Sequence, residues 1–412
     1  MRYFVYTLFA FLLLGCGPGD HMDEESMDST PETVTTNILY YGDIINNTVV
    51  ALDTTLMQPI KNIDSNGDYP YEIAQALGNE LYILNRKDYT IGVLDPASDT
   101  ITDEIALDFY PRSIKINNSD ILLTSANEPA AAIITSHIAS LSYTDSQYKE
   151  PVSYGGSNAT GHPVWVDNDH FLLLDRTENT IELYRKDFYQ PIDKLTTKSS
   201  VHHVIEKNNI FYGISEGEQN GVSPGILKFT VTNGRIMLQQ ERLLSSLPDL
   251  PEDFLPATWG AHHGALHPTQ NYIYIGSAEG NVFVLELEKL ELADTFKTGK
   301  GIGHFTFYGT MLITTNHYDN FKSFYNAADP RNHKFLKELR FSDHIYKGIT
   351  MQSHTTHIID NKLYFMFNTD HDSTLYKINL DTITIEGGVS LANHYCLMGT
   401  LVSNNTTTSS GM

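Results

Sequence analysis

The sequence predicts an all-β fold, a β-propeller of four-stranded blades, and two observations support this prediction. After residue 37, strand-like runs follow one another at intervals of about 8–12 residues with turn residues between them, and helical periodicity is almost absent. These runs also recur in groups of four that span about 40 residues, the length of a propeller blade. The clearest group has runs that begin at His263, Tyr272, Asn281 and Leu292.

The repeat predicts eight blades in chain order. Seven complete units have inner strands that begin near Tyr71, Ser113, Val164, His203, His263, His304 and His354. Residues 38–63 add three strands that lack an inner strand, and we expect the run Cys396–Val402 to supply it. This pairing closes the ring between the two ends of the chain and leaves no sheet edge exposed. Seven blades remain the alternative, if the weak repeat near residues 110–155 is an insertion.

The N-terminus has the features of a targeting segment. Arg2 precedes an apolar stretch from Tyr3 to Leu14, which is too short to span a bilayer as a mature helix. The following Gly15-Cys16 resembles the end of a bacterial lipobox, which implies cleavage before Cys16 and lipidation of that residue. Gly17 then implies an outer-membrane lipoprotein that faces the periplasm. We expect a lipoprotein signal peptide and lipidated cysteine over residues 1–16, a flexible acidic tether over 17–36, a single propeller domain over 37–403, and a disordered tail over 404–412.

Composition excludes several classes of function. The chain has 27 basic and 50 acidic residues, a formal net charge of −23, which argues against a nucleic-acid partner and attracts cations. Cys396 is the only cysteine besides Cys16, so the mature monomer forms no internal disulfide, and we expect Cys396 to be buried. The sequence has no nucleophile elbow, phosphate-binding glycine loop or dinucleotide fingerprint, so we expect a binding protein rather than an enzyme. We also expect the protein to be a monomer.

Histidine recurs once per repeat, at the start of the predicted inner strands. In a propeller these positions are equivalent, so five to seven imidazoles are expected to converge on one central channel. Neutral imidazole is the commonest metal ligand in proteins, and a zinc site needs three or four such ligands about 2 Å from one point. Arg112 holds the same position in an earlier unit. The candidate metal ligands are His162, His202, His203, His262, His263, His304 and His354.

Two qualifications apply to the histidines. Neighbouring side chains of a strand point to opposite faces, so only one member of each twin pair, 202–203 and 262–263, is expected to face the channel unless the chain bends there. His317 is interpreted as part of a strand ending rather than as a ligand. The histidines interpreted as solvated turn residues are His267, His333, His344 and His371.

The stretch from about 160 to 290 resembles the periplasmic zinc metallochaperone propellers that work with zinc ABC importers. The residues that carry the resemblance are Gly161-His162, His202-His203, the loop Glu216–Pro224, His262-His263 and a late strand near His354. It implies a protein that holds zinc on histidines and passes it to a zinc solute-binding protein or another periplasmic metal acceptor. Those proteins carry a flexible arm rich in His and Asp, whereas this chain has only His21 among acidic residues there.

Two other classes stay open. Gly301–Phe307 resembles a ligand strand of the copper propellers of the nitrous oxide reductase type, which would make the bound metal copper. Against this alternative, the sequence has neither a cupredoxin domain nor a Cys-x-x-Cys-His haem motif. The third class is a scaffold that binds a protein or a glycan without metal. There, Gly161-His162 and Gly303-His304 would buttress blades as in tryptophan–aspartate repeat propellers, although the matching Trp-Asp dipeptide is absent.

Overall fold

The computed structural model describes residues 32–408, apart from 77–78, 118–119, 126–129, 136–146, 149–151, 154–160, 187, 218–221 and 255–262. The predicted signal peptide with Cys16, most of the predicted tether and the last four residues therefore lie outside the described part. β1 begins at Glu32 and β33 ends at Thr408, so both strands extend a few residues past the predicted domain limits of 37 and 403.

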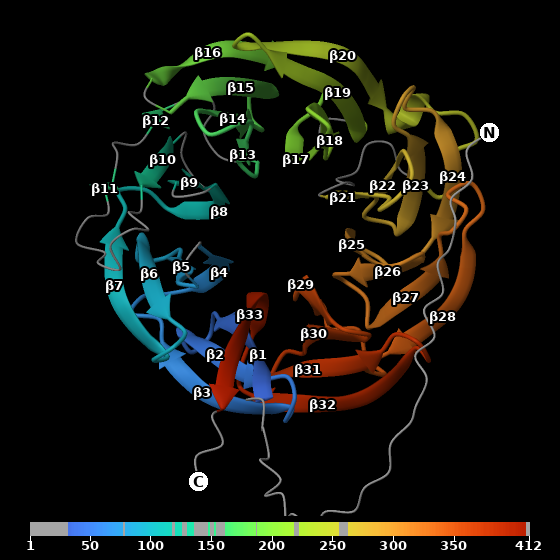
Figure 1. Cartoon of the computed structure of the whole chain (residues 1–412). Coiled ribbons are helices and arrows are strands. Elements are labelled where there is room, and N and C mark those ends of the chain that lie inside the picture. Colours follow the sequence, from blue (N-terminus) through green and yellow to red (C-terminus); the bar gives the residue numbers. More distant parts are fainter. Residues whose placement is uncertain are drawn as a thin grey trace, which may run out of the picture. The chain divides into compact units, whose positions relative to one another are not determined.

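The strands form eight antiparallel sheets that follow one another around a ring (Figure 1). Blade 1 is β1 (Glu32–Asp43), β2 (Thr48–Asp53), β3 (Gln58–Asp64) and β33 (Cys396–Thr408). Blade 2 is β4 (Pro70–Gln75), β5 (Leu81–Asn85), β6 (Thr90–Asp95) and β7 (Thr100–Ala106). Blade 3 is β8 (Pro111–Asn117), β9 (Asp120–Ser125) and β10 (Ala130–Thr135), with β11 (Gln147–Tyr148) and β12 (Val152–Ser153) outside them. Blade 4 is β13 (Val164–Trp165), β14 (His170–Asp175), β15 (Thr180–Arg185) and β16 (Phe188–Thr196).

The second half of the ring repeats the plan. Blade 5 is β17 (Val201–Lys207), β18 (Ile210–Ser215), β19 (Gly225–Thr232) and β20 (Arg235–Leu243), followed by the short 3-10 helix η2 (Leu244–Ser246). Blade 6 is β21 (Gly264–Leu266), β22 (Tyr272–Gly276), β23 (Asn281–Glu286) and β24 (Leu292–Lys297). Blade 7 is β25 (Ile302–Tyr308), β26 (Met311–Asn316), β27 (Phe321–Asn326) and β28 (Lys334–Arg340). Blade 8 is β29 (Gln352–Ile359), β30 (Lys362–Asn368), β31 (Asp372–Asn379) and β32 (Thr384–Ala392).

The predicted eight-bladed propeller is confirmed, with four strands in seven of the blades and two short strands, β11 and β12, at the outer edge of blade 3. The weak repeat near residues 110–155 forms a sheet of its own, built on β8, β9 and β10, so the alternative of seven blades is wrong. Within the described ranges the only helix is η2, and no helix is both long and apolar enough to cross a membrane.

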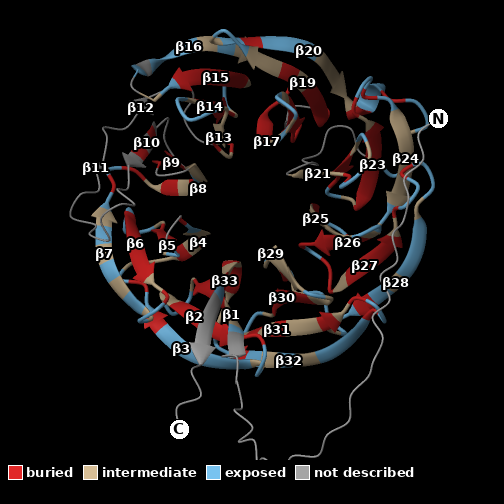
Figure 2. Cartoon of the chain, viewed as in Figure 1, coloured by how far each residue is buried: buried red, intermediate tan, exposed pale blue. Residues whose placement is uncertain are grey.

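The apolar core lies between the blades rather than at the centre of the ring. The described residues form eight buried clusters, and each cluster joins two neighbouring blades. The second and third strands of a blade are packed on both faces, so they are continuous apolar runs such as Leu81–Leu84. Outer strands such as β7 alternate between exposed and half-buried residues. Figure 2 shows this difference between the buried middle strands and the exposed outer strands.

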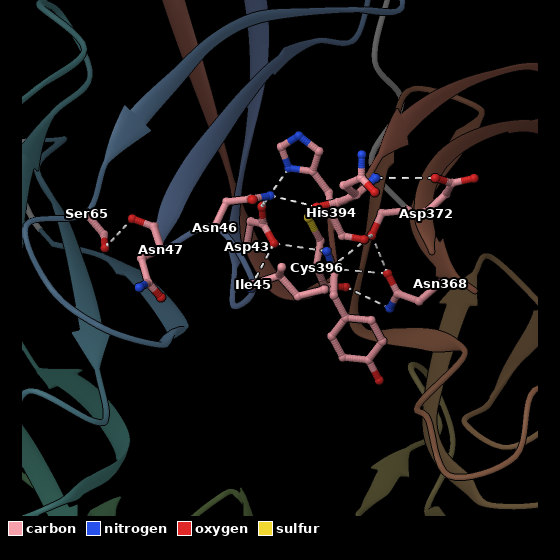
Figure 3. A network of polar contacts seen from close by, with 12 residues as sticks. Asp43, Ile45, Asn46, Asn47, Ser65, Asn368, Asp372, His394 and Cys396 are labelled. Carbon is pink, nitrogen blue, oxygen red and sulfur yellow. Dashed lines mark hydrogen bonds and ion pairs between the residues drawn. The ribbon is translucent and has the colours of Figure 1, made fainter. Parts of the chain in front are cut away.

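The ring closes in blade 1, where β33 lies beside β1 as the sequence predicts. The buried carboxylate of Asp43 accepts a hydrogen bond from the backbone N–H of Tyr395 at 3.0 Å and lies 2.7 Å from Nδ1 of His394. On the other side, the Asn368 amide of blade 8 donates to the carbonyl of Cys396 at 2.9 Å and accepts from its N–H at 3.2 Å (Figure 3). Cys396 is fully buried, as expected. These contacts hold the C-terminal strand to both of its neighbours.

Candidate metal centre

The inner-strand histidines line one central cavity. Inner strands of all eight blades face the axis of the ring (Figure 1), and the cavity between them has a volume of about 480 Å³. Each blade supplies the residue at or near the start of its inner strand. In chain order from blade 2 these residues are Tyr71, Arg112, His162, His202, His263, His304 and His354, and blade 1 adds Met398. Five of the predicted histidines thus line one cavity.

Bulges in the inner strands aim these side chains. The pairing of β17 with β18 shifts register between Val201 and His203. His202 is therefore a bulge residue of β17 that has no paired residue in β18. A bulge bends the strand locally and re-aims the side chains next to it. As a result both twins lie near His263, whose ring centroid is 5.2 Å from that of His202 and 4.6 Å from that of His203. Of this pair, His202 lines the cavity, whereas His203 lies against His263.

The first group of possible ligands, the first triad, consists of His162, His202 and His263. One nitrogen from each ring lies within 4.8 Å of the other two. Blades 4 and 5 are fixed to each other at this point, because the backbone N–H of His162 donates to the carbonyl of His202 at 2.9 Å. A Cβ on Gly161 would lie 2.7 Å from that carbonyl oxygen, so the close approach of the two strands requires glycine there.

Polar neighbours orient the first triad. Nδ1 of His162 is hydrogen-bonded to Oγ of Ser113 at 2.7 Å, and Nδ1 of His202 lies 3.1 Å from Oε1 of Glu216. The Glu216 carboxylate is itself paired with Arg176. Ligand histidines in metal sites typically engage their second nitrogen in this way, because the contact fixes the orientation and tautomer of the ring. Nε2 of both histidines is then the atom that faces the cavity.

The second triad consists of His304, His317 and His354, and one nitrogen from each ring again lies within 4.8 Å of the others. Nδ1 of the buried His317 donates to the backbone carbonyl of Gln352 at 3.1 Å, so Nε2 is the ring nitrogen that carries the lone pair. A Cβ on Gly303 would lie 2.6 Å from that Nε2 atom. Glycine at position 303 therefore leaves the space that His317 occupies.

The two triads are adjacent. The rings of His263, in the first triad, and His304, in the second, stack with centroids 4.3 Å apart and an interplanar angle of 28°. Histidines of blades 4 to 8 thus form one continuous arc along the wall of the cavity rather than two isolated groups.

His317 was not predicted as a ligand. It occupies a second position that recurs from blade to blade, directly after the second strand. It directly follows β26, the second strand of blade 7. The residue after the second strand is also close to the cavity in three other blades, where it is Arg86, Arg176 or Glu216. Inner and second strands are antiparallel, so the start of one and the end of the other meet at the same rim of the blade. This offset is the sequence signal that identifies His317.

Burial keeps the histidines of the channel neutral. Desolvation lowers the pKa of His203 to about 3, with nearby Lys115 and His202 as further causes. Desolvation also lowers the pKa of His162 and of His263 well below 6.5, and neighbouring histidines add to both shifts. Neutral imidazole is the form that binds a metal ion, so these rings are ready to bind metal at neutral pH.

The donor set fits zinc. Zinc binds imidazole nitrogen at about 2.0–2.1 Å in tetrahedral geometry, which places two ligand nitrogens about 3.3 Å apart. The nitrogens of each triad lie within 4.8 Å of one another, so metal binding shortens these distances by at most about 1.5 Å. Nδ1 of His203 is buried without a hydrogen-bond partner among the described residues, and it lies next to the first triad. Copper prefers the same imidazole donors, so the donor atoms by themselves favour neither metal.

Five more histidines that have a sequence-based interpretation fall into three groups. His262, a predicted ligand, lies outside the described residues. His344 and His371 are exposed, in agreement with their interpretation as turn residues. That interpretation is wrong for His267, which is buried, and for His333, whose side chain has no exposed surface. Nε2 of His267 lies 3.0 Å from the carbonyl oxygen of Ala327, and Nδ1 of His333 lies 2.7 Å from Asp294.

The fold and the cavity define an eight-bladed β-propeller with a histidine-lined channel. No protein-family model and no curated protein sequence matches the chain. Among solved structures, it is similar to apo AztD from Citrobacter koseri, with a TM-score of 0.64 and 10% identity over 92% of this chain and 100% of that one. It is also similar to the dihydro-heme d1 dehydrogenase NirN in complex with DHE, with a TM-score of 0.62 and 10% identity over 89% of this chain and 74% of that one. The predicted resemblance to a known class of propellers is thus confirmed for the fold.

Proposed function

We propose that this protein binds zinc in the channel of the propeller and passes it to a periplasmic metal acceptor, such as a zinc solute-binding protein. The observation that carries the proposal is the gathering of six histidines from blades 4 to 8 into two adjacent triads that line one cavity. The resemblance of the sequence to zinc metallochaperone propellers supports zinc as the cargo, and so does the fold shared with AztD.

Three protein ligands leave one position of a tetrahedral zinc ion open. An open position lets an incoming ligand bind before a protein ligand leaves, which suits a site that releases its metal to a partner. The stacked rings of His263 and His304 place the two triads next to each other, so the channel has room for two ions in sequence. The acidic surface, with a net charge of −23, favours the approach of cations.

The location follows from the N-terminal sequence. Lipidation at Cys16 would anchor the protein in the cell envelope, and Gly17 after the cysteine favours the outer membrane with the propeller facing the periplasm. Acyl chains hold the protein at the membrane while the folded body stays in the aqueous phase. In this position the propeller would meet both incoming zinc and soluble metal acceptors.

The proposal is tested by elemental analysis of residues 17–412, purified without an affinity tag from the periplasm, by plasma mass spectrometry. The expected result is up to two equivalents of zinc per chain, and transfer to a metal acceptor upon mixing. Two equivalents of copper would assign the site to copper instead. No bound metal, with none taken up from excess zinc or copper, would contradict a metal site and favour a scaffold propeller.

A further inference from the structure

The half of the channel built by blades 2 and 3 carries guanidinium groups where the half built by blades 4 to 8 carries imidazoles. Arg86 and Arg112 both line the cavity, and Arg176 of blade 4 lies close enough to Arg112 to lower its pKa. Burial, followed by repulsion from Arg176 and Arg86, lowers the pKa of Arg112 to about 10. Arg112 therefore remains cationic at neutral pH.

The cations of this half outnumber its carboxylates. Glu216 is paired with Arg176 and also lies beside His202. The buried Glu72 interacts electrostatically with Lys115 and Arg86. Within the described part of the chain, neither Arg86 nor Arg112 forms an ion pair with a carboxylate at contact distance. Burial of an unpaired charge costs free energy unless a partner neutralises it, so an anionic ligand would stabilise these two guanidinium groups.

Arg86 is held in place but has a donor to spare. Its Nη2 atom donates to the carbonyl of Arg112 at 2.7 Å, and its guanidinium lies over the ring of Tyr71 at 3.2 Å from the centroid. Its Nε atom is buried and has no hydrogen-bond partner among the residues that the structure describes. A fixed guanidinium with an unused donor, facing a cavity, is the arrangement that binds a planar or tetrahedral anion.

We propose that this half of the channel binds a small oxyanion, a carboxylate or phosphate-type group, on Arg86 and Arg112. Arginine presents its donors in a rigid fork that matches two oxygen atoms of such a group. The cavity of about 480 Å³ has room for both the anion and the triads. If the proposed zinc site is correct, an anion here also offsets the repulsion between the arginines and a metal ion at the first triad, so anion and zinc strengthen each other's binding.

The test is isothermal titration calorimetry of metal-free protein, residues 17–412, with sodium sulfate, inorganic phosphate and acetate at low ionic strength. We expect one anion per chain for at least one of these probes, and at least ten-fold weaker binding in Arg112→Met. Preferential binding of acetate would indicate a carboxylate ligand, and preferential binding of sulfate or phosphate a tetrahedral oxyanion. Arg235→Met is the matched control, because Arg235 is exposed at the start of the outer strand β20.

Two comparisons keep the outcome clear. Arg112→Lys retains the charge, so partial binding by this variant separates the loss of charge from misfolding. Zinc content measured on the same variants separates this proposal from the zinc site: Arg112→Met should still take up zinc when the metal is in excess. Absence of binding by the unmodified protein, or equal binding by the unmodified protein and Arg112→Met, would overturn the proposal whatever the zinc content.

Discussion

The channel has two unlike halves on one repeated scaffold. Blades 4 to 8 place imidazoles at the start of their inner strands, whereas blades 2 and 3 place Tyr71 and Arg112 at the same position. The residue directly after the second strand also differs between the two halves: it is His317 in blade 7 but Arg86 in blade 2. Two positions per repeat thus decide whether a sector of the wall suits a cation or an anion, while the strands around them stay the same.

The two triads within the histidine half also differ. The first triad has a carboxylate behind it, because Glu216 lies 3.1 Å from Nδ1 of His202. The second has a backbone carbonyl behind His317 instead. A carboxylate makes the ring a stronger donor to a metal than a carbonyl does. We therefore expect the first triad to bind zinc more tightly than the second.

The largest effect is expected when one triad is removed at a time. His202→Ala with His263→Ala should abolish one equivalent of zinc, and His304→Ala with His354→Ala should abolish the other, because a single remaining imidazole does not hold the ion. Zinc content and a competition titration with a chromophoric chelator measure both. The matched control is His344→Ala with His371→Ala, two exposed histidines. Full occupancy in either triad variant would contradict the assignment.

A smaller change separates the triads without removing a ligand. In Gly303→Ala, the new methyl group would meet Nε2 of His317 at 2.6 Å and displace the ring. We expect roughly a 100-fold loss of zinc affinity at the second site, comparable to the loss of an orienting contact, with the first site unchanged. Gly387→Ala is the control, since no atom lies within 4 Å of a Cβ at that position and Gly387, like Gly303, lies in a strand without a positive φ. Equal losses at both sites would show that the triads do not act separately.

The carboxylate behind the first triad provides a third test. Glu216→Gln keeps the shape of the side chain but removes the charge next to His202, so zinc affinity at the first site should fall about 10- to 100-fold. The second site should keep its affinity because His317 is oriented by the backbone carbonyl of Gln352 instead. Competition titrations of the variant and the unmodified protein provide the comparison. An unchanged first site would mean that Glu216 serves only to pair with Arg176.

The smallest effect concerns pH and separates the histidine half from the arginine half. The pKa of His203 is lowered to about 3 and that of His357 to about 4, so both stay neutral in the folded protein while an unfolded chain protonates them below about 6.5. The unfolded state then binds more protons, and the metal-free protein should lose roughly 1.4 kcal/mol of stability per buried histidine for each pH unit below 6.5. Arg112 stays charged throughout this range.

Urea unfolding at pH 7.5, 6.5 and 5.5 measures this dependence. Stability should be complete above pH 6.5 and should fall as the pH drops toward the lowered pKa values. His203→Gln removes one titrating group and should flatten the slope. A stability that does not change between pH 7.5 and 5.5 would mean that the imidazoles are not held neutral by burial.

Much of the fold follows from the sequence because each blade repeats the same local pattern. The eight blades and the closing strand at Cys396 follow from the strand-like runs, and the convergence of His162, His202, His263, His304 and His354 follows from their equivalent places in the repeat. These predictions need only the period of the repeat and the geometry of a closed ring.

What the sequence did not predict depends on contacts between distant residues. His317 follows a second strand instead of starting an inner one, so the column of inner-strand histidines does not include it. The bulge at His202, which places both twins next to His263, leaves no pattern in the residue types. His333 was interpreted as solvated because it follows a turn, yet its side chain is buried by its contact with Asp294, 39 positions away.

The central claim is that the channel holds metal on two separate histidine triads. Anomalous diffraction at the zinc edge, from crystals of residues 17–412 grown with zinc, tests it most directly. The predicted result is two peaks, one among His162, His202 and His263 and one among His304, His317 and His354. Peaks only on surface carboxylates or exposed histidines, with none in the channel, would contradict the claim.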